Sequence, residues 1–269
     1  MNSPRRRTLG SLLLLAFLLA GSFGCQWFTA RDELNKGITA YRAQNYTLAA
    51  EHFEAATEAD PEHIVARQYL ATAYATQFVP GMDTPENQQV AERAIEEYEL
   101  VLQMDPGNIG SISGIASMYF QMKDMERAKE YYLQQIQLDG ENPEPYYSIG
   151  VIDWTMTYQP RMDLKTALGI APDAPIHLDD EREELAERSL PLIDEGMEML
   201  NRAMELREEY DDAMAYLNLL YREKADLVAT EEEREELLST ADSWIDRAVE
   251  IKRIRAEREL EDANSGLGG

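Results

Sequence analysis

Few side chains in this sequence have the types and spacing that catalysis or metal binding requires. The three histidines, His52, His63 and His177, are scattered, and none has a second candidate ligand at helical spacing. A single cysteine, Cys25, excludes an intramolecular disulfide and a thiolate metal site. The chain has no phosphate-binding glycine loop, no HExxH motif and no Ser/His/Asp arrangement favoured by spacing. We therefore expect no catalytic residue, no metal site and no cofactor.

The charge of the chain restricts its partners. It contains 25 Lys and Arg and 51 Asp and Glu, a formal net charge of −26. Such a surface repels phosphate backbones, which disfavours nucleic-acid binding. It favours a basic protein or peptide partner whose binding weakens with salt. For any single acid, a solvated helix face remains the simpler interpretation.

The elements that position side chains in this chain are paired helices, seen most clearly over residues 109–142. Two apolar stripes at helical spacing mark the pair. The first stripe comprises Ile112, Ile115, Ala116 and Tyr119, and the second Met125, Ala128, Tyr132, Gln135 and Ile136. One such pair cannot bury both stripes by itself, so it needs copies on either side.

Copies of the second helix are found by counting. Sets with steps of 4, 3 and 5 residues occur as Ala49–Phe53–Ala56–Pro61, Ala94–Tyr98–Val101–Pro106, Ala128–Tyr132–Gln135–Gly140, Gly196–Leu200–Ala203–Glu208 and Ala241–Ile245–Ala248–Arg253. Their first residues are 45, 34, 68 and 45 apart. A marker of the preceding helix keeps the same spacing, in Leu70, Ile115, Ile149 and Leu217. Both markers indicate a 34-residue period with insertions.

This pattern resembles the tetratricopeptide repeat family. The matching residues are Gly37, Tyr46, Ala49, Phe53, Ala56 and Pro61; Leu70, Ala71, Tyr74, Ala94, Tyr98 and Pro106; Ile115, Ala116, Tyr119, Ala128 and Tyr132; Tyr146, Ile149, Gly150 and Ala203; and Leu217, Tyr221, Ala241 and Ala248. The resemblance implies an all-α, right-handed superhelical solenoid of about five helix-turn-helix repeats. The repeats are expected near residues 30–63, 64–108, 109–142, 143–210 and 211–263, with insertions in the second, fourth and fifth.

In the resembling family, extended peptides usually lie in a concave groove lined by the first helix of each pair. The residues expected to project there are Tyr41, Arg42, Gln68, Thr72, Ser113, Ser117, Phe120, Tyr147, Trp154 and Arg222. The aromatic members could anchor apolar groups, and the polar members could hold a peptide backbone. An aromatic side chain at helical spacing can equally belong to the core.

The N-terminus predicts an export signal over residues 1–24, with a basic stretch at Arg5–Arg7 and an apolar run at Leu9–Ala20. This run is shorter than the roughly 20 residues that span a bilayer. Cys25 then stands where bacterial lipoproteins carry a lipidated cysteine. That resemblance implies a lipid anchor, a short tether over residues 25–29 and, from the non-acidic Gln26, the outer membrane. Ser22 stands where such sites usually have Leu, so ordinary cleavage to a soluble periplasmic protein and retention as an uncleaved anchor stay open.

The insertions predict longer helices and one long loop. In the second repeat, Thr84 and Pro85 are typical of a helix start. In the fifth, a capping box at Thr230 is the one plausible break, and both helices are expected to lengthen. The insert at residues 155–187 is expected to form an ordered loop around a short helix at residues 163–168, then a helix from Asp179 that Pro191 kinks. It could be a packing brace or a binding loop. Acidic clusters at residues 179–184 and 231–236 are typical of helix starts.

The last helix, expected from residue 231 to about residue 263, carries a basic cluster of Lys252, Arg253, Arg255 and Arg258. A polar outer face is the expected role of a terminal helix. Contact with anionic lipid or with the acidic face of another copy is the alternative. Residues 264–269 are expected to form a disordered tail.

These features favour a non-catalytic protein–protein interaction scaffold, exported and lipid-anchored in the bacterial envelope. A partner protein or peptide would bind in the concave groove or at the 155–187 insert. One alternative is a structural or self-assembling spacer whose groove is filled by its own insert. Another is a lipoprotein that assists outer-membrane protein assembly. The sequence specifies neither the partner nor the oligomeric state.

Overall fold

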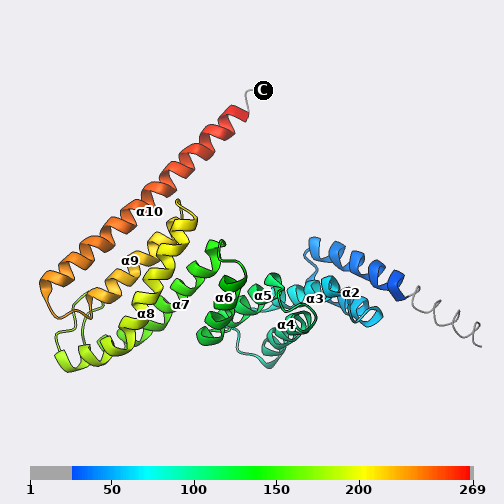
Figure 1. Cartoon of the computed structure of the whole chain (residues 1–269), viewed down its shortest axis with the longest axis horizontal. Helices are drawn as coiled ribbons and strands as arrows, with labels where there is room; N and C mark the ends of the chain where they lie inside the picture. Colours follow the sequence, from blue (N-terminus) through cyan, green and yellow to red (C-terminus); the bar gives the residue numbers. More distant parts are fainter. Residues whose placement is uncertain (1–25, 267–269) are drawn as a thin grey trace, which may run out of the picture. The chain divides into compact units, whose positions relative to one another are not determined.

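The computed structural model describes residues 26–266, with side chains described up to residue 262. Helices are the regular elements of that part of the chain, and no strand occurs between its ends (Figure 1). The predicted all-α fold is therefore confirmed. None of the described helices is long and apolar enough to cross a membrane. The predicted signal, Cys25 and residues 267–269 lie outside the described residues.

The chain divides into two compact units, Met1–Asp124 and Met125–Gly269. The described part of the first unit contains a helix over residues 26–42, followed by α2 (Tyr46–Ala59), α3 (Ile64–Gln77), α4 (Pro85–Met104) and α5 (Ile109–Gln121). From α2 to α5 each helix packs against the next, and α3 also contacts α5. Contact between alternate helices is what stacked helix pairs require. Residues 26–29, where we expected a tether, are already helical.

Side chains in the first unit set the ends of its helices. Thr84 Oγ1 accepts a hydrogen bond from the Asn87 backbone N–H at 3.3 Å, so α4 begins at Pro85 as the sequence predicted. The buried Asn87 side chain also accepts from the Val79 N–H and donates to the Val79 and Met82 carbonyls, at 2.8–2.9 Å. These bonds order the inserted loop before α4.

The small residues of the repeat pattern allow close packing. Ala49 and Ala94 are fully buried in the first unit, and so is Ala128 in the second. A Cβ atom added to Gly37 would lie 2.4 Å from the Phe53 ring, and one added to Gly150 would lie 2.5 Å from Leu200. Both glycines therefore admit a large side chain from the next helix. The predicted buried stripes of the repeat are confirmed at these positions.

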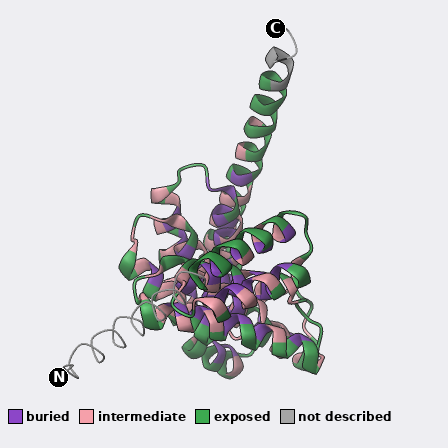
Figure 2. Cartoon of the chain, turned by 90° about the vertical axis from the view of Figure 1, so that its right-hand side faces the viewer, coloured by how far each residue is buried: buried purple, intermediate pink, exposed green. Residues whose placement is uncertain are grey.

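The second unit contains α6 (Met125–Leu138), α7 (Pro143–Leu168), α8 (Asp179–Leu206), α9 (Asp211–Ala225) and α10 (Glu231–Gly266). The helix α7 packs against α6, α8 and α9, and α9 also packs against α8 and α10. Residues of α8 and α9, among them Leu185, Leu200 and Leu217, form a buried hydrophobic cluster. The far part of α10 is exposed (Figure 2).

The prediction for the long insert is wrong in its first half. We expected a loop around a short helix at residues 163–168, but α7 runs without a break from Pro143 to Leu168. Pro160 lies inside this helix on an exposed surface, where water can satisfy the carbonyl that loses its partner. The irregular part is confined to residues 169–178, and α8 begins at Asp179 as predicted. The helix α8 also continues through Pro191.

The fifth repeat breaks where the sequence predicted, but its extra length lies in one helix. Thr230 Oγ1 accepts from the Glu233 N–H at 3.3 Å, and α10 begins at Glu231. The helix α9 has 15 residues and α10 has 36, so the expectation that both helices lengthen is wrong. The helix α9 ends at Ala225. The next two residues are buried, Asp226 in an ion pair with Arg161 and Leu227 in the hydrophobic core. The helix α10 continues to Gly266, past the expected end near residue 263.

The basic cluster of α10 is paired within the chain. Arg253 bonds Glu250 and Glu257 on its own helix, at 2.6 and 2.5 Å. The other three bases contact acids at the start of α9, in the pairs Lys252–Asp211, Lys252–Asp212, Arg255–Asp211 and Arg258–Glu209. Three of the four bases thus face residues 209–212 at or just before the start of α9, and the basic side chains stay largely exposed.

Candidate functional site

Aromatic side chains form a continuous strip on α7 and α9 of the second unit. Tyr147, Trp154 and Tyr158 are seven and four residues apart along α7, so they share one face of the helix. Tyr216 of α9 lies between them, with ring centroids 5.7 Å from Tyr147 and 5.4 Å from Trp154. The rings of Trp154 and Tyr158 are 5.0 Å apart. We call these four residues the aromatic strip.

The strip is neither core nor free surface. Tyr147, Trp154 and Tyr216 are half-buried, and Tyr158 is 37% exposed. Packed rings of this kind present a rigid apolar surface at low entropic cost, which is typical of binding hot spots. The Trp154 Nε1–H is buried and has no hydrogen-bond partner among the described residues.

One end of the strip has an acidic border. The exposed Glu144 accepts a hydrogen bond from the Tyr210 hydroxyl at 3.0 Å and pairs with Arg207 at 2.6 Å. Asp212, also exposed, stands near Tyr147. Burial raises the pKa of the Tyr147 hydroxyl, and the negative potential of Asp212 and Glu144 adds to this rise. Both acids already face bases of the chain, since Glu144 pairs with Arg207 and Asp212 with Lys252 at 3.5 Å.

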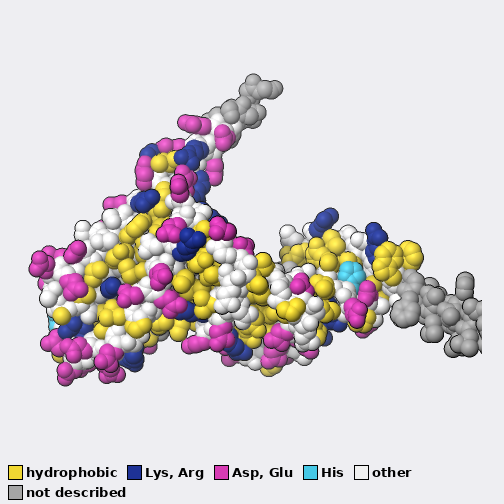
Figure 3. All heavy atoms as spheres, in the orientation of Figure 1, with side chains coloured by type: hydrophobic (Ala, Val, Ile, Leu, Met, Phe, Trp, Pro, Cys, Tyr) yellow, Lys and Arg dark blue, Asp and Glu magenta, His cyan; other side chains and the backbone are white. Residues whose placement is uncertain are grey.

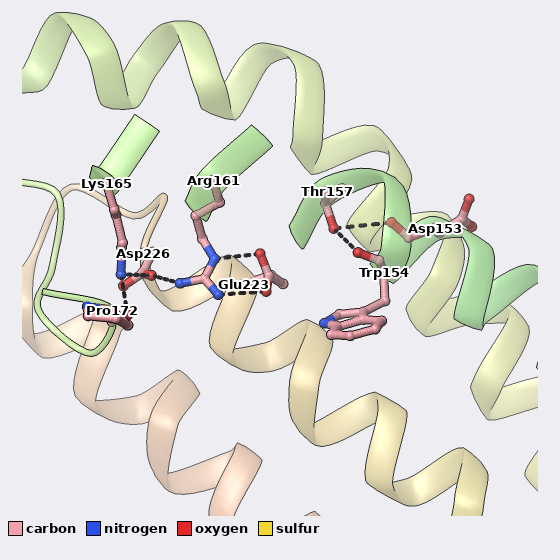
Figure 4. Close-up of polar contacts among 8 residues, drawn as sticks. All are labelled: Asp153, Trp154, Thr157, Arg161, Lys165, Pro172, Glu223 and Asp226. Carbon is pink, nitrogen blue, oxygen red and sulfur yellow. Dashed lines mark hydrogen bonds and ion pairs between the residues drawn. The ribbon is translucent and has the colours of Figure 1, made fainter. Parts of the chain in front are cut away.

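The other end of the strip continues into a buried cluster of four charges, which we call the charge cluster: Arg161, Lys165, Glu223 and Asp226. The Arg161 guanidinium forms two parallel bonds to Glu223, at 2.6 and 2.9 Å, and a third to Asp226 at 2.6 Å. Lys165 bonds Asp226 and donates to the Pro172 carbonyl at 2.8 Å. Figure 4 shows Arg161 and Lys165 pointing from α7 toward these carboxylates.

The charge cluster joins α7 to the end of α9, and none of its four charged groups is unpaired and so available as a catalytic acid or base. Its two positive and two negative charges balance, and each is bonded to an opposite charge. Burial raises the pKa of Glu223 even though it bonds Arg161. Burial alone would lower the pKa of Arg161, but its bonds to Glu223 and Asp226 raise it instead. The cluster therefore holds the second half of α7 against the end of α9.

A second ion pair lies on another side of α7. The buried carboxylate of Asp153 bonds Lys129 of α6 at 2.6 Å, and Lys129 also bonds Glu195 of α8 at 2.9 Å. Burial raises the pKa of Asp153 to about 6, because the loss of water outweighs the attraction of Lys129. The trio joins three helices. Across the described residues, no group of three or more potential ligands is placed to hold a metal ion.

The residues expected to line a groove fall in both units. In the first unit, most polar members bond their own neighbours. Gln68 donates to Asn108 at 2.6 Å, and Thr72 donates to the Gln68 carbonyl at 2.7 Å. The Tyr41 hydroxyl bonds Thr76 at 3.0 Å. Tyr41 and Gln68 therefore join α3 to the helix over residues 26–42 and to the start of α5, whereas the Thr72 bond lies within α3.

The other expected residues of the first unit are more available. Ser113 and Phe120 are half-buried, and Arg42 is exposed. Ser117 is half-buried and accepts a hydrogen bond from Gln121 at 3.1 Å. No described contact brings these four together into one site.

In the second unit, the structure brings Tyr147 and Trp154 together through Tyr216, whereas Arg222 is exposed and pairs with Asp242 of α10. Tyr216, the charge cluster and the Lys129–Asp153–Glu195 trio were not predicted from the sequence. The sequence does show that Arg161 and Lys165 are four residues apart and that Glu223 and Asp226 are three apart. This spacing places each pair on one face of a helix. The contact between these two faces joins residues 62 apart in the chain, Arg161 and Glu223, and could not be predicted from local spacing.

Comparisons with known proteins agree with this architecture. Residues 111–142 match the family model described as tetratricopeptide repeat. No curated protein matches the chain. Among solved structures, "MamA 41-end from Desulfovibrio magneticus RS-1" has a TM-score of 0.58 at 14% identity, covering 84% of this chain and 96% of its own. YrrB, described as "a TPR protein with an unusual peptide-binding site", has a TM-score of 0.51 at 14% identity, covering 82% of this chain and 90% of its own.

A further structure of a MamA protein has a TM-score of 0.58 at 14% identity, covering 85% of this chain and 94% of its own. At these identities the likeness extends to the fold alone. Residues 111–142 are thus a tetratricopeptide repeat, and the described chain has the fold of tetratricopeptide-repeat proteins.

Proposed function

We propose that this protein is a non-catalytic binding scaffold that holds an extended segment of a partner protein against the aromatic strip. The observation that carries the proposal is the row of half-buried rings centred on Trp154, kept in place by the charge cluster at one end. Tetratricopeptide-repeat proteins are generally scaffolds of this kind, and YrrB is described as having a peptide-binding site.

The chemistry of the strip suggests the ligand. An aromatic surface favours an apolar side chain, and the net charge of −26 favours Lys or Arg beside it. We further propose that the chain is exported and attached to a membrane through a lipid on Cys25, facing the periplasm of a bacterial envelope. Support for this part comes from the sequence of the first 25 residues.

A selection of binding peptides tests the ligand. A displayed library of random 12-residue peptides is selected on the folded chain, and the binders are measured by fluorescence anisotropy. Trp154→Ala should weaken these binders at least tenfold, because it removes the centre of the strip. Raising the salt concentration should weaken binding further if the bound peptides carry Lys or Arg.

The control for this experiment is Trp244→Ala. Trp244 is also half-buried but lies on α10, which contributes no residue to the strip. Both variants are first checked for helix content and thermal midpoint. Binders that respond equally to the two variants would contradict the proposed site, and the scaffold would then bind elsewhere.

The spacer alternative has one observation in its favour: the long insert packs onto its own unit. Ile176 is buried, Lys165 bonds Asp226, and Arg182 donates to the Leu227 carbonyl at 3.4 Å, so the insert braces the end of α9. The brace leaves Tyr158 exposed, and for this reason we prefer the binding scaffold.

A further inference from the structure

Two large aromatic side chains are exposed at the beginning of the described chain. Trp27 is 48% exposed and Phe28 is 69% exposed, and their rings meet edge to face with centroids 5.0 Å apart. Figure 3 shows hydrophobic side chains gathered where the helix over residues 26–42 begins. Two neighbouring aromatic rings in water are costly, and such patches usually mark a contact surface.

The place of these rings relative to Cys25 indicates what covers them. The helix is already formed at residue 26, so no irregular segment separates the cysteine from the repeat array. Even a fully extended chain would put Trp27 within about 7 Å and Phe28 within about 11 Å of Cys25. The headgroup region of a bilayer is about 5–8 Å thick on each side. A lipid on Cys25 therefore brings both rings to the membrane interface.

A cation on the same helix face completes the surface. Arg31 follows Trp27 by one turn, and its guanidinium lies 5.5 Å from the centroid of the Trp27 ring. It is exposed, and the neighbouring acids Asp32 and Glu33 are both bonded to Lys36 at 2.7 Å. The guanidinium can thus reach a lipid phosphate without losing an ion pair to a described residue.

We propose that Trp27, Phe28 and Arg31 form a membrane-contact surface that seats the first helix in the interface of a phospholipid bilayer. Tryptophan is typical of this depth, because its ring is apolar and its N–H can still reach water or a headgroup. The inference rests on the proposed anchor at Cys25. The occupant is a zwitterionic phospholipid surface, since the chain from Cys25 onward has 22 basic and 51 acidic side chains and is repelled by anionic lipid. The first repeat then lies directly on the membrane and not on a stalk.

The single cysteine allows a direct test. The chain beginning at Cys25 is coupled to phosphatidylcholine vesicles that contain a small fraction of maleimide-bearing phosphatidylethanolamine, so a chemical bond replaces the acyl anchor. Trp154→Phe and Trp244→Phe leave Trp27 as the one tryptophan, whose emission can be excited selectively over that of the tyrosines. On coupling, we expect its emission to shift to shorter wavelength and its quenching by aqueous acrylamide to fall several-fold. Quenching by lipids with a nitroxide near the headgroup should appear at the same time.

A matched reporter and a matched variant complete the design. A chain with Trp244 as the one tryptophan, made by Trp27→Phe and Trp154→Phe, should show no change on coupling. Phe28→Asp with Arg31→Asp should restore the access of acrylamide to Trp27. The exposed Val249 of α10 offers a control, because Val249→Asp should leave the quenching of Trp27 unchanged.

Unchanged acrylamide quenching of Trp27 in the coupled chain would overturn the inference. Chemical coupling keeps this result separate from the anchor itself: a cell that leaves Cys25 unmodified would contradict the proposed anchor without altering the vesicle measurement. If Trp27 is protected in coupled chains but Cys25 carries no lipid in cells, the membrane-contact surface is supported and the proposed lipid anchor is contradicted.

Discussion

Asp153 shows how a single buried carboxylate makes stability depend on pH. Its pKa rises from 3.8 to about 6 in the folded chain, chiefly through burial. The folded state therefore binds a proton more readily than the unfolded state between these values. The contribution of Asp153 to stability is complete below about pH 4 and is lost as the pH rises through 6. At neutral pH Asp153 is ionised, and a neutral group at this position would give the folded state a larger free energy of unfolding.

Asp153→Asn tests this account. The amide resembles the protonated acid, and Lys129 keeps Glu195 at 2.9 Å as its partner. We expect the variant and the natural chain to unfold with similar free energies near pH 4. Near pH 7.5 the variant should be more stable by up to about 3 kcal/mol. Urea unfolding at both pH values measures the difference, and a variant less stable than the natural chain at pH 7.5 would contradict the prediction.

At the scale of elements, the second half of α7 is held by contacts far away in the sequence. Arg161 and Lys165 follow an internal proline and bond carboxylates at the end of α9. A helix interrupted by proline loses about 3 kcal/mol or more from local terms, so tertiary contacts must stabilise this extension. The same contacts fix the loop at residues 169–178, since Lys165 holds the Pro172 carbonyl.

Arg161→Met should be strongly destabilising for this reason. It leaves Glu223 buried without its partner, a change that costs about 3–5 kcal/mol. Urea unfolding gives the loss, and amide hydrogen exchange should quicken over residues 161–178. Combining Arg161→Met with Glu223→Gln should recover part of the stability, because the unpaired charge is then removed. Arg188→Met, at an exposed pair on α8, serves as the control and should change little. An equal, small loss in both single variants would argue against a brace.

At the scale of the whole molecule, charge and attachment act together. Removal of residues 1–24 takes away three arginines and no acid, which leaves 22 basic and 51 acidic side chains and a net charge of −29. Figure 3 shows the acids spread over the visible face of the described residues. Such a surface is not attracted to a bilayer, so the proposed membrane association would have to come from a covalent anchor or a local apolar contact.

Cys25→Ser should therefore release the protein from membranes in cells. A single exposed aromatic patch is too small to retain it, whereas a lipid and the patch together give two attachment signals. Fractionation of membranes and soluble extract, with mass analysis of the mature N-terminus, measures both retention and modification. Unchanged association of the serine variant, or an unmodified thiol in the natural chain, would contradict the lipid anchor.

The repeat architecture could be predicted from the sequence because its signal is local. Buried positions recur every three or four residues along each helix, and the pairs recur every 34 residues, so Ala49, Ala94 and Ala128 could be placed in the core by counting alone. Helix starts at Thr84 and Thr230 were equally local, because a cap depends on residues within one turn.

The tertiary structure alone decided what happens between distant residues. The sequence predicted a loop around a short helix at residues 163–168, but the pairing of Arg161 with Glu223, 62 residues later, stabilises a continuous helix there. Tyr216 joined Tyr147 and Trp154 only because α9 packs against α7. Most of the polar residues expected to be available in the first unit bond their own neighbours instead. Periodicity specifies which face of a helix is buried, whereas the partner of each side chain depends on packing that the local sequence does not encode.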